Sequence, residues 1–181
     1  VNRDNVMGVS LEDLIPKASD REEVWKSSNG ILVRGSKSKL RVRDSEFLNC
    51  IAGCIVKKGA SAEIYKSKFV CCGRERTDSA GLVSSGRGSL AICDACEFVE
   101  SEHHGVKAER EGQIQLKGCH ISKVHHQGVL AVGRNSRVSL DECEVVSAGI
   151  CGLFANQRAI IQVANSRITK CSEAGICSSF L

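Results

Sequence analysis

The chain has 181 residues, which is enough for one domain with a sizeable core and short for two. Hydrophobic residues at 42% and charged residues at 25% are close to globular averages and exclude a disordered tail. No apolar run has the length of a membrane-spanning helix, so we expect no transmembrane segment. A net charge of +4, with acids and bases intermixed, gives no reason to expect a nucleic-acid partner.

Residues 1–28 are predicted to form an N-terminal capping segment. Ser10-Leu11-Glu12-Asp13 and Ser19-Asp20-Arg21-Glu22 resemble capping boxes, and each predicts a short helix. Pro16 is expected to end the first helix. The apolar residues of this segment could cover the open end of a repeated structure, which solenoids require. They are Leu11, Leu14, Ile15, Val24 and Trp25.

From residue 29 onward a repeat governs the sequence. A glycine followed by an apolar segment recurs every 23 or 24 residues, with one interval of 28. The extra residues fall within Cys72–Asp78, which predicts an inserted loop. The seven repeated glycines are Gly30, Gly53, Gly81, Gly105, Gly128, Gly152 and Gly175.

A second segment of each repeat has period two, which is typical of a strand with one buried face. It comprises residues 40–42, 62–64, 90–92, 114–116, 138–140 and 161–163. A small residue follows at Ser45, Ser67, Cys96, Cys119, Cys143 and Ser166, with the third repeat taken as one residue longer. A large apolar residue comes two positions later, at Phe47, Phe69, Phe98, Ile121, Val145 and Ile168.

Each repeat thus predicts three short strands that cannot enclose a core alone but can do so when stacked in parallel. We predict an all-β, single-stranded, right-handed parallel β-helix of about six rungs over residues 29–181, where a rung is one turn of the solenoid. The leucine-rich horseshoe is the competing solenoid, but its asparagine-bearing consensus is missing. The Leu181 end shows no comparable cap, so we expect further chain or a partner to cover it.

One outward column supports this register. The residues between the small and the large positions alternate in charge, so that unlike charges become neighbours on adjacent rungs. They are Glu46, Lys68, Glu97, His120, Glu144 and Arg167. We interpret this column as structural rather than as an ionic binding strip.

The glycine-anchored rungs resemble the parallel β-helix repeat of the pectin-lyase-like superfamily, and more narrowly the CASH repeats of intracellular eukaryotic proteins. That resemblance implies the fold and raises glycan cleavage as an activity to consider. The hydrolase motifs Asn-Thr-Asp and Asp-Asp do not occur, and His103-His104-Gly105 is a partial match to Gly-His-Gly. A lyase-type calcium site needs several acids, and only Glu100 and Glu102 cluster.

Inverting hydrolysis needs two carboxylates about 6.5–9.5 Å apart. Glu109 and Glu111 share a predicted corner but have no accompanying basic motif. Tyr65 is the one aromatic residue predicted on an outer face, so platforms for stacking sugars are scarce. We therefore expect a protein that is not an enzyme, with a glycan hydrolase or lyase as the alternative.

Two histidine pairs, His103-His104 and His125-His126, precede the glycines of successive rungs. Stacking would place His103 near His126 and Glu102 near His125, which could form a transition-metal or pH-sensitive site. The alternative is a polar corner that repeats with the rungs, and we expect no metal and no other cofactor. If a metal site exists, its predicted ligands are His103, His126, His125 and Glu102.

The 11 cysteines fall mainly in apolar columns, which favours buried, reduced thiols over a disulfide framework. Cys96, Cys119 and Cys143 form one inward column, and Cys50, Cys72 and Cys171 form another. Stacked side chains point in parallel and suit a disulfide poorly. Alternation predicts that Cys93 points outward. We expect an intracellular, reducing compartment, either the cytoplasm or an organelle matrix or stroma.

The candidate binding residues are basic residues of the first rung and charged residues of the inserted loop, since insertions on repeat proteins often lie on the binding face. They are Lys39, Arg41, Arg43, Arg74, Glu75, Arg76 and Asp78. We expect a non-catalytic β-helix scaffold that binds protein partners or serves as a subunit of a larger complex. The alternatives are a protein that binds or cleaves an acidic polysaccharide and a metal-binding module that uses the paired histidines.

Overall fold

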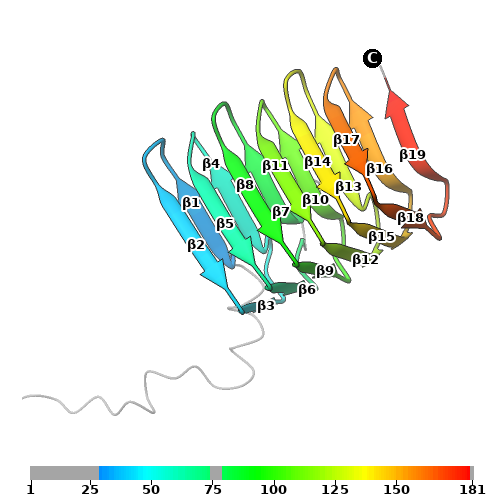
Figure 1. Cartoon of the computed structure of the whole chain (residues 1–181), viewed down its shortest axis with the longest axis horizontal. Coiled ribbons are helices and arrows are strands. Elements are labelled where there is room, and N and C mark those ends of the chain that lie inside the picture. Colours follow the sequence, from blue (N-terminus) through cyan, green and yellow to red (C-terminus); the bar gives the residue numbers. More distant parts are fainter. Residues whose placement is uncertain (1–28, 74–78, 180–181) are drawn as a thin grey trace, which may run out of the picture.

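The computed structural model describes residues 29–73 and 79–179. Within these ranges the chain forms strands and no helix, arranged as stacked rungs along the long axis (Figure 1). The capping segment predicted at residues 1–28 and the core of the predicted insertion, residues 74–78, lie outside the described residues. The all-β parallel β-helix of about six rungs is confirmed.

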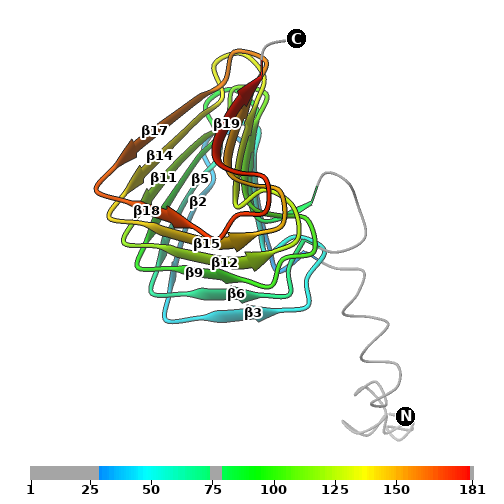
Figure 2. The same cartoon turned by 90° about the vertical axis from the view of Figure 1, so that its right-hand side faces the viewer.

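The described strands assemble into three parallel sheets that form the sides of the solenoid (Figure 2). Sheet A contains β1 (Ile31–Arg34), β4 (Cys54–Lys57), β7 (Ala80–Ser85), β10 (His104–Glu109), β13 (Val129–Val132), β16 (Cys151–Asn156) and β19 (Ala174–Ser179). Sheet B contains β2 (Lys39–Arg43), β5 (Ser61–Tyr65), β8 (Leu90–Asp94), β11 (Gln113–Lys117), β14 (Arg137–Asp141) and β17 (Ile160–Ala164). Sheet C contains β3 (Glu46–Leu48), β6 (Lys68–Val70), β9 (Glu97–Val99), β12 (His120–Val124), β15 (Glu144–Ala148) and β18 (Arg167–Thr169).

The core is built from like residues stacked on adjacent rungs. Phe47, Phe69 and Phe98 form a stack with ring centroids 5.0 and 5.1 Å apart. The repeated glycines allow neighbouring rungs to approach closely. A Cβ atom on Gly105 would lie 2.6 Å from the carbonyl oxygen of Gly128 and 2.6 Å from Ile121. The glycine repeat therefore reflects contact between backbones.

The charge column on sheet C is also present. Lys68 Nζ lies 3.4 Å from Glu97, and Glu144 lies 3.2 Å from His120 Nδ1 and 3.9 Å from Arg167. The register that placed unlike charges on adjacent rungs is confirmed.

The predicted register of the third rung is wrong by one residue in sheet B. Ala91 pairs with Ala62 and Ile114, so Ala91 and Cys93 point inward and are 0% exposed. Leu90 and Ile92 point outward and are half-buried. Cys93 is therefore not on the outer face, and the third rung needs no extra residue before Cys96. The register was misassigned because Leu90 and Ile92 are apolar, as the inward residues of the other rungs are.

The corner between sheets B and C is a single residue in the left-handed region on every rung. Its φ values lie between 46° and 56°, which turns the chain sharply while keeping both flanking strands in register. These residues are Asp44, Lys66, Ala95, Gly118, Glu142 and Asn165.

The final rung exposes columns that are buried elsewhere. Ile176 is 64% exposed, whereas Leu153, its neighbour in the same column, is 0% exposed. Val163 is 40% exposed and pairs with Leu140, which is 2% exposed. Within the described part of the chain, no residue covers this end of the core.

Candidate functional site: a groove on the outer face of sheet A

One outward column runs along the whole of sheet A and is mostly apolar. The register places its members side by side on consecutive strands, in the order Leu32, Ile55, Val83, Lys107, Leu130, Phe154 and Cys177. An outward position on a solenoid wall normally faces water. Yet Val83, Lys107 and Leu130 are only 6%, 4% and 7% exposed.

The corner that leads from sheet C into sheet A accounts for part of this burial. After each strand of sheet C the chain runs past sheet A and then bends back to enter it (Figure 2). Ala52 and Ser79 at this corner are themselves buried, at 2% and 6% exposed, and both line the same hollow as the outward Ile55 and Val83. The outer face of sheet A is therefore flanked by the corner along one side.

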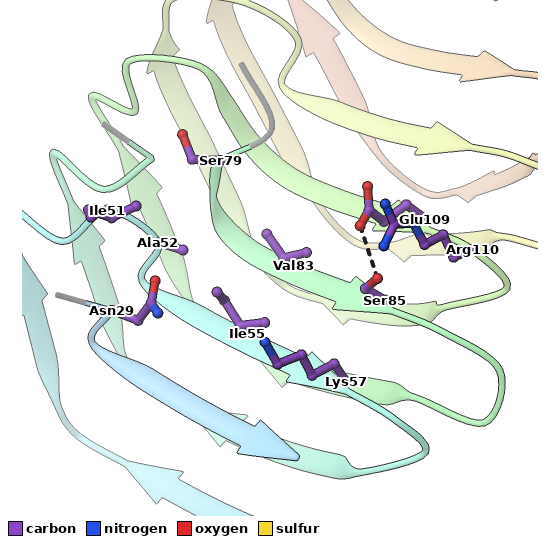
Figure 3. A pocket seen from close by; sticks show the side chains of 10 residues that line it. All are labelled: Asn29, Ile51, Ala52, Ile55, Lys57, Ser79, Val83, Ser85, Glu109 and Arg110. Atoms are coloured by element: carbon purple, nitrogen blue, oxygen red, sulfur yellow. Dashed lines mark hydrogen bonds between the residues drawn. The ribbon is translucent and has the colours of Figure 1, made fainter. Parts of the chain in front are cut away.

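Between the corner and the sheet lies a groove of about 460 Å³ across the first rungs. Its lining residues are Asn29, Ile51, Ala52, Ile55, Lys57, Ser79, Val83, Ser85, Glu109 and Arg110. Figure 3 shows the outward side chains of Ile55 and Val83 in the middle, with Ser79 and Ala52 towards the start of the strands. The charged lining residues, Lys57, Glu109 and Arg110, lie towards the ends of the strands. We call this feature the sheet A groove.

The carboxylate of the groove is held by its own neighbours. Glu109 accepts a hydrogen bond of 2.9 Å from Ser85 Oγ and lies 3.0 Å from Lys107 Nζ. Lys107 is almost fully buried, so this ion pair offsets the cost of placing an ammonium group in an apolar column. Among the lining residues that the structure describes, Glu109 is the one carboxylate. The lining residues that the structure describes thus include no carboxylate pair of the kind that glycoside hydrolysis uses.

The predicted basic binding residues lie on another wall. Lys39, Arg41 and Arg43 are exposed on β2 of sheet B. Arg41 donates to Glu63 Oε2 through Nε at 2.8 Å, and this contact lowers the pKa of Glu63. Arg43 lies 5.0 Å from the ring centroid of Tyr65. The structure brings these cations together but places them outside the groove, while Arg74, Glu75, Arg76 and Asp78 lie beyond the described residues.

Three histidines lie together where the corner enters sheet A. The ring centroids of His103 and His126 are 4.9 Å apart, as the stacking of rungs predicts, and His104 lies 5.8 Å from His126. Burial and the neighbouring His126 lower the pKa of His103. In residues 29–73 and 79–179, no group of three or more His, Cys, Asp or Glu side chains is placed to hold a metal ion. The set His103, His126, His125 and Glu102 does not form such a group.

The inward cysteines pack as small apolar residues. Cys96, Cys119 and Cys143 are 0%, 1% and 2% exposed. Burial raises the pKa of Cys54 and of Cys72 to about 12, so both thiols hold their protons at neutral pH. The sequence interpretation of these columns as core is confirmed for Cys50, Cys72, Cys96, Cys119 and Cys143, whereas Cys171 on the final rung is half-buried.

Sequence reasoning missed the sheet A groove. It considered the basic residues of the first rung and the inserted loop, but not the outward residues of sheet A. The signal was present in Ile55, Val83 and Leu130, which are apolar at outward positions where solvent-exposed strands usually carry polar residues.

Stacked rungs and three parallel sheets define a parallel β-solenoid, and the sheet A groove lies along one of its sides. The chain belongs to the right-handed beta helix region family, whose pattern it matches over residues 29–180. Neither the curated proteins nor the solved structures include a match to it. A helix long and apolar enough to cross a membrane does not occur in the described ranges.

Proposed function

We propose that this β-helix is a non-catalytic interaction module that binds a protein partner through the sheet A groove. The main support for this proposal is the composition of the groove, which has apolar side chains at its centre and charged groups at one side. Ile55 and Val83 supply the apolar centre, and Lys57, Glu109 and Arg110 supply the charged side. An apolar centre bordered by polar and charged groups is also the arrangement found at protein interfaces, which supports the proposal.

The chemistry of the groove favours binding over catalysis. Its described carboxylate is engaged by Ser85 and Lys107 rather than facing a second acid across a water. The rigid solenoid behind it suits a scaffold, because stacked rungs hold the lining residues at fixed spacing. The exposed apolar end at Ile176 and Val163 offers a second contact surface for a larger assembly.

Affinity purification of the full chain, followed by quantitative mass spectrometry, tests this proposal. The test variant is Ile55→Glu, which adds a charge at an outward, half-buried position of the groove. The matched control is Ile92→Glu, because Ile92 is also outward and half-buried but lies on sheet B. We expect the partner's recovery to fall at least about tenfold with Ile55→Glu and to be unchanged with Ile92→Glu. Equal recovery from both variants would contradict the proposal.

A second candidate is binding of an acidic polysaccharide, which Lys57 and Arg110 at the groove favour. It predicts retention of the chain on a polyuronate column, lost with Lys57→Glu and with Arg110→Glu. Polyuronate binding or cleavage by a chain that purifies without a protein partner would replace the first proposal with this one.

A further inference from the structure

Two thiols meet at the C-terminal end of sheet A. The Sγ atoms of Cys151 and Cys177 lie 3.0 Å apart. A disulfide bond is about 2.05 Å long, so a movement of about 1 Å separates this contact from a covalent bridge. The two residues come from neighbouring strands, β16 and β19, which pair along their length.

The approach of these thiols differs from that of the stacked core cysteines. Cys177 pairs in register with Phe154 and points outward, whereas Cys151 pairs with Ala174 at the corner that enters the sheet. Their side chains therefore come from different columns and converge. In the inward column the thiols belong to one column, and Cys119 and Cys96 also donate to carbonyl oxygens, of Cys93 at 3.5 Å and of Ile64 at 3.4 Å.

The two thiols also differ in accessibility. Cys151 is 4% exposed, and burial raises its pKa to about 11. Cys177 is half-buried on the outer face. A dissolved oxidant meets Cys177 first, because Cys177 is the more exposed of the two. The thiolate is the nucleophile, so the raised pKa of Cys151 also protects it from direct reaction.

We propose that Cys151 and Cys177 form a reversible disulfide that fastens β19 to the preceding rung. The oxidant is a small-molecule disulfide of the glutathione type. The Cys177 thiolate attacks one of its sulfurs, which forms a mixed disulfide and releases one thiol. The Cys151 sulfur then attacks the Cys177 sulfur, loses its proton to solvent, and displaces the second thiol. Two protein thiols are oxidised to one disulfide, and the small disulfide is reduced to two thiols.

The bridge would act on the least supported strand of sheet A. In the described structure β19 pairs with β16 on one side only. Its inward Ile176 is 64% exposed, so little burial holds the strand in place. A covalent link between the two strands reduces the local opening of β19. This inference stands independently of the proposed partner binding.

The test uses the full chain in glutathione redox buffers, with alkylation of the remaining thiols and peptide mapping by mass spectrometry. We expect one bridge between Cys151 and Cys177, and hydrogen exchange in Ala174–Ser179 slowed by about tenfold or more on oxidation. The matched control is Cys171→Ser, which removes another half-buried thiol of the final rung. That variant should form the same bridge and show the same slowing.

The order of attack is tested by two further variants. Cys151→Ser should accumulate a glutathione adduct on Cys177, because the resolving thiol is missing. Cys177→Ser should leave Cys151 unmodified, because burial shields it. The proposal is overturned if oxidation leaves both thiols alkylatable, if it joins other cysteines to an equal extent, or if Cys151 acquires the adduct in Cys177→Ser.

Discussion

Gly105 shows why a single residue type recurs on every rung. A side chain here would collide with the backbone of the next rung, at 2.6 Å from the Gly128 oxygen. We expect Gly105→Ala to lower the free energy of unfolding by about 1–3 kcal/mol, as overpacking does in close-packed cores. Denaturant unfolding followed by circular dichroism measures this loss.

Gly175→Ala is the matched control for that substitution. Gly175 occupies the same column on the final described rung, where an added Cβ would meet Ile168 at an ordinary 3.6 Å. Its substitution should change the free energy of unfolding by less than about 0.5 kcal/mol. Equal losses at both positions would show that the close approach of rungs does not account for the glycine repeat.

His103 makes stability depend on pH. Burial, with a smaller contribution from His126, lowers its pKa below the ordinary 6.5. Between these two pKa values the unfolded chain binds a proton that the folded chain does not, so stability falls as pH drops through about 6.5. Above that range His103 is neutral in both states and contributes no pH dependence.

We expect His103→Gln to flatten the dependence of the unfolding free energy on pH between about 7 and 5, and to leave the slope near pH 8 unchanged. Thermal or denaturant unfolding across this range measures both slopes. A variant whose acid slope equals that of the natural chain would show that His103 is not desolvated.

At the scale of elements, the charge column on sheet C tests the stacking of strands. Glu144 lies between His120 and Arg167, at 3.2 and 3.9 Å. Glu144→Lys removes the contact with His120 and turns the attraction to Arg167 into a repulsion, and we expect a loss of about 0.5–1 kcal/mol at low salt that shrinks at high salt. Glu142→Lys is the control, because it changes the net charge equally from an exposed corner two residues away. A larger loss from the control would contradict the assigned neighbours.

The elements also show where sequence reasoning succeeds and where it stops. Repeated glycines and phenylalanines fixed the register of sheets A and C, because contacts between like residues on adjacent rungs select those residue types. The slip at Leu90–Ile92 arose because two outward apolar residues imitate an inward pair. Their true partners, Ala91 and Cys93, are small and give a weaker pattern.

The sheet A groove could not be predicted from these repeat patterns. Its shape depends on how far the corner residues overhang sheet A, and a period of two shows only that Ile55 and Val83 point outward. The burial of Lys107 was equally hidden, because it requires both Glu109 and the two apolar neighbours on adjacent strands. The contact of Cys151 with Cys177 joins residues of different columns, so aligning like positions of adjacent rungs in the sequence does not reveal it.

At the scale of the whole molecule, the solenoid is a rigid wall with a groove along one side and an exposed apolar end. Sheet B, with its partnered Arg41 and Arg43, presents cations that already have neighbours. Sheet A instead presents Ile55 and Val83 between the corner and the charged residues. We therefore propose sheet A, rather than sheet B, as the surface that binds a partner.

Hydrogen exchange of the full chain, with and without the partner it co-purifies with, tests that assignment most directly. We predict slower exchange in β4 and β7, where Ile55 and Val83 line the groove, and unchanged exchange in β5 and β8 of sheet B. Protection confined to sheet B or to the final rung would contradict it, as would a bound partner that protects no part of sheet A.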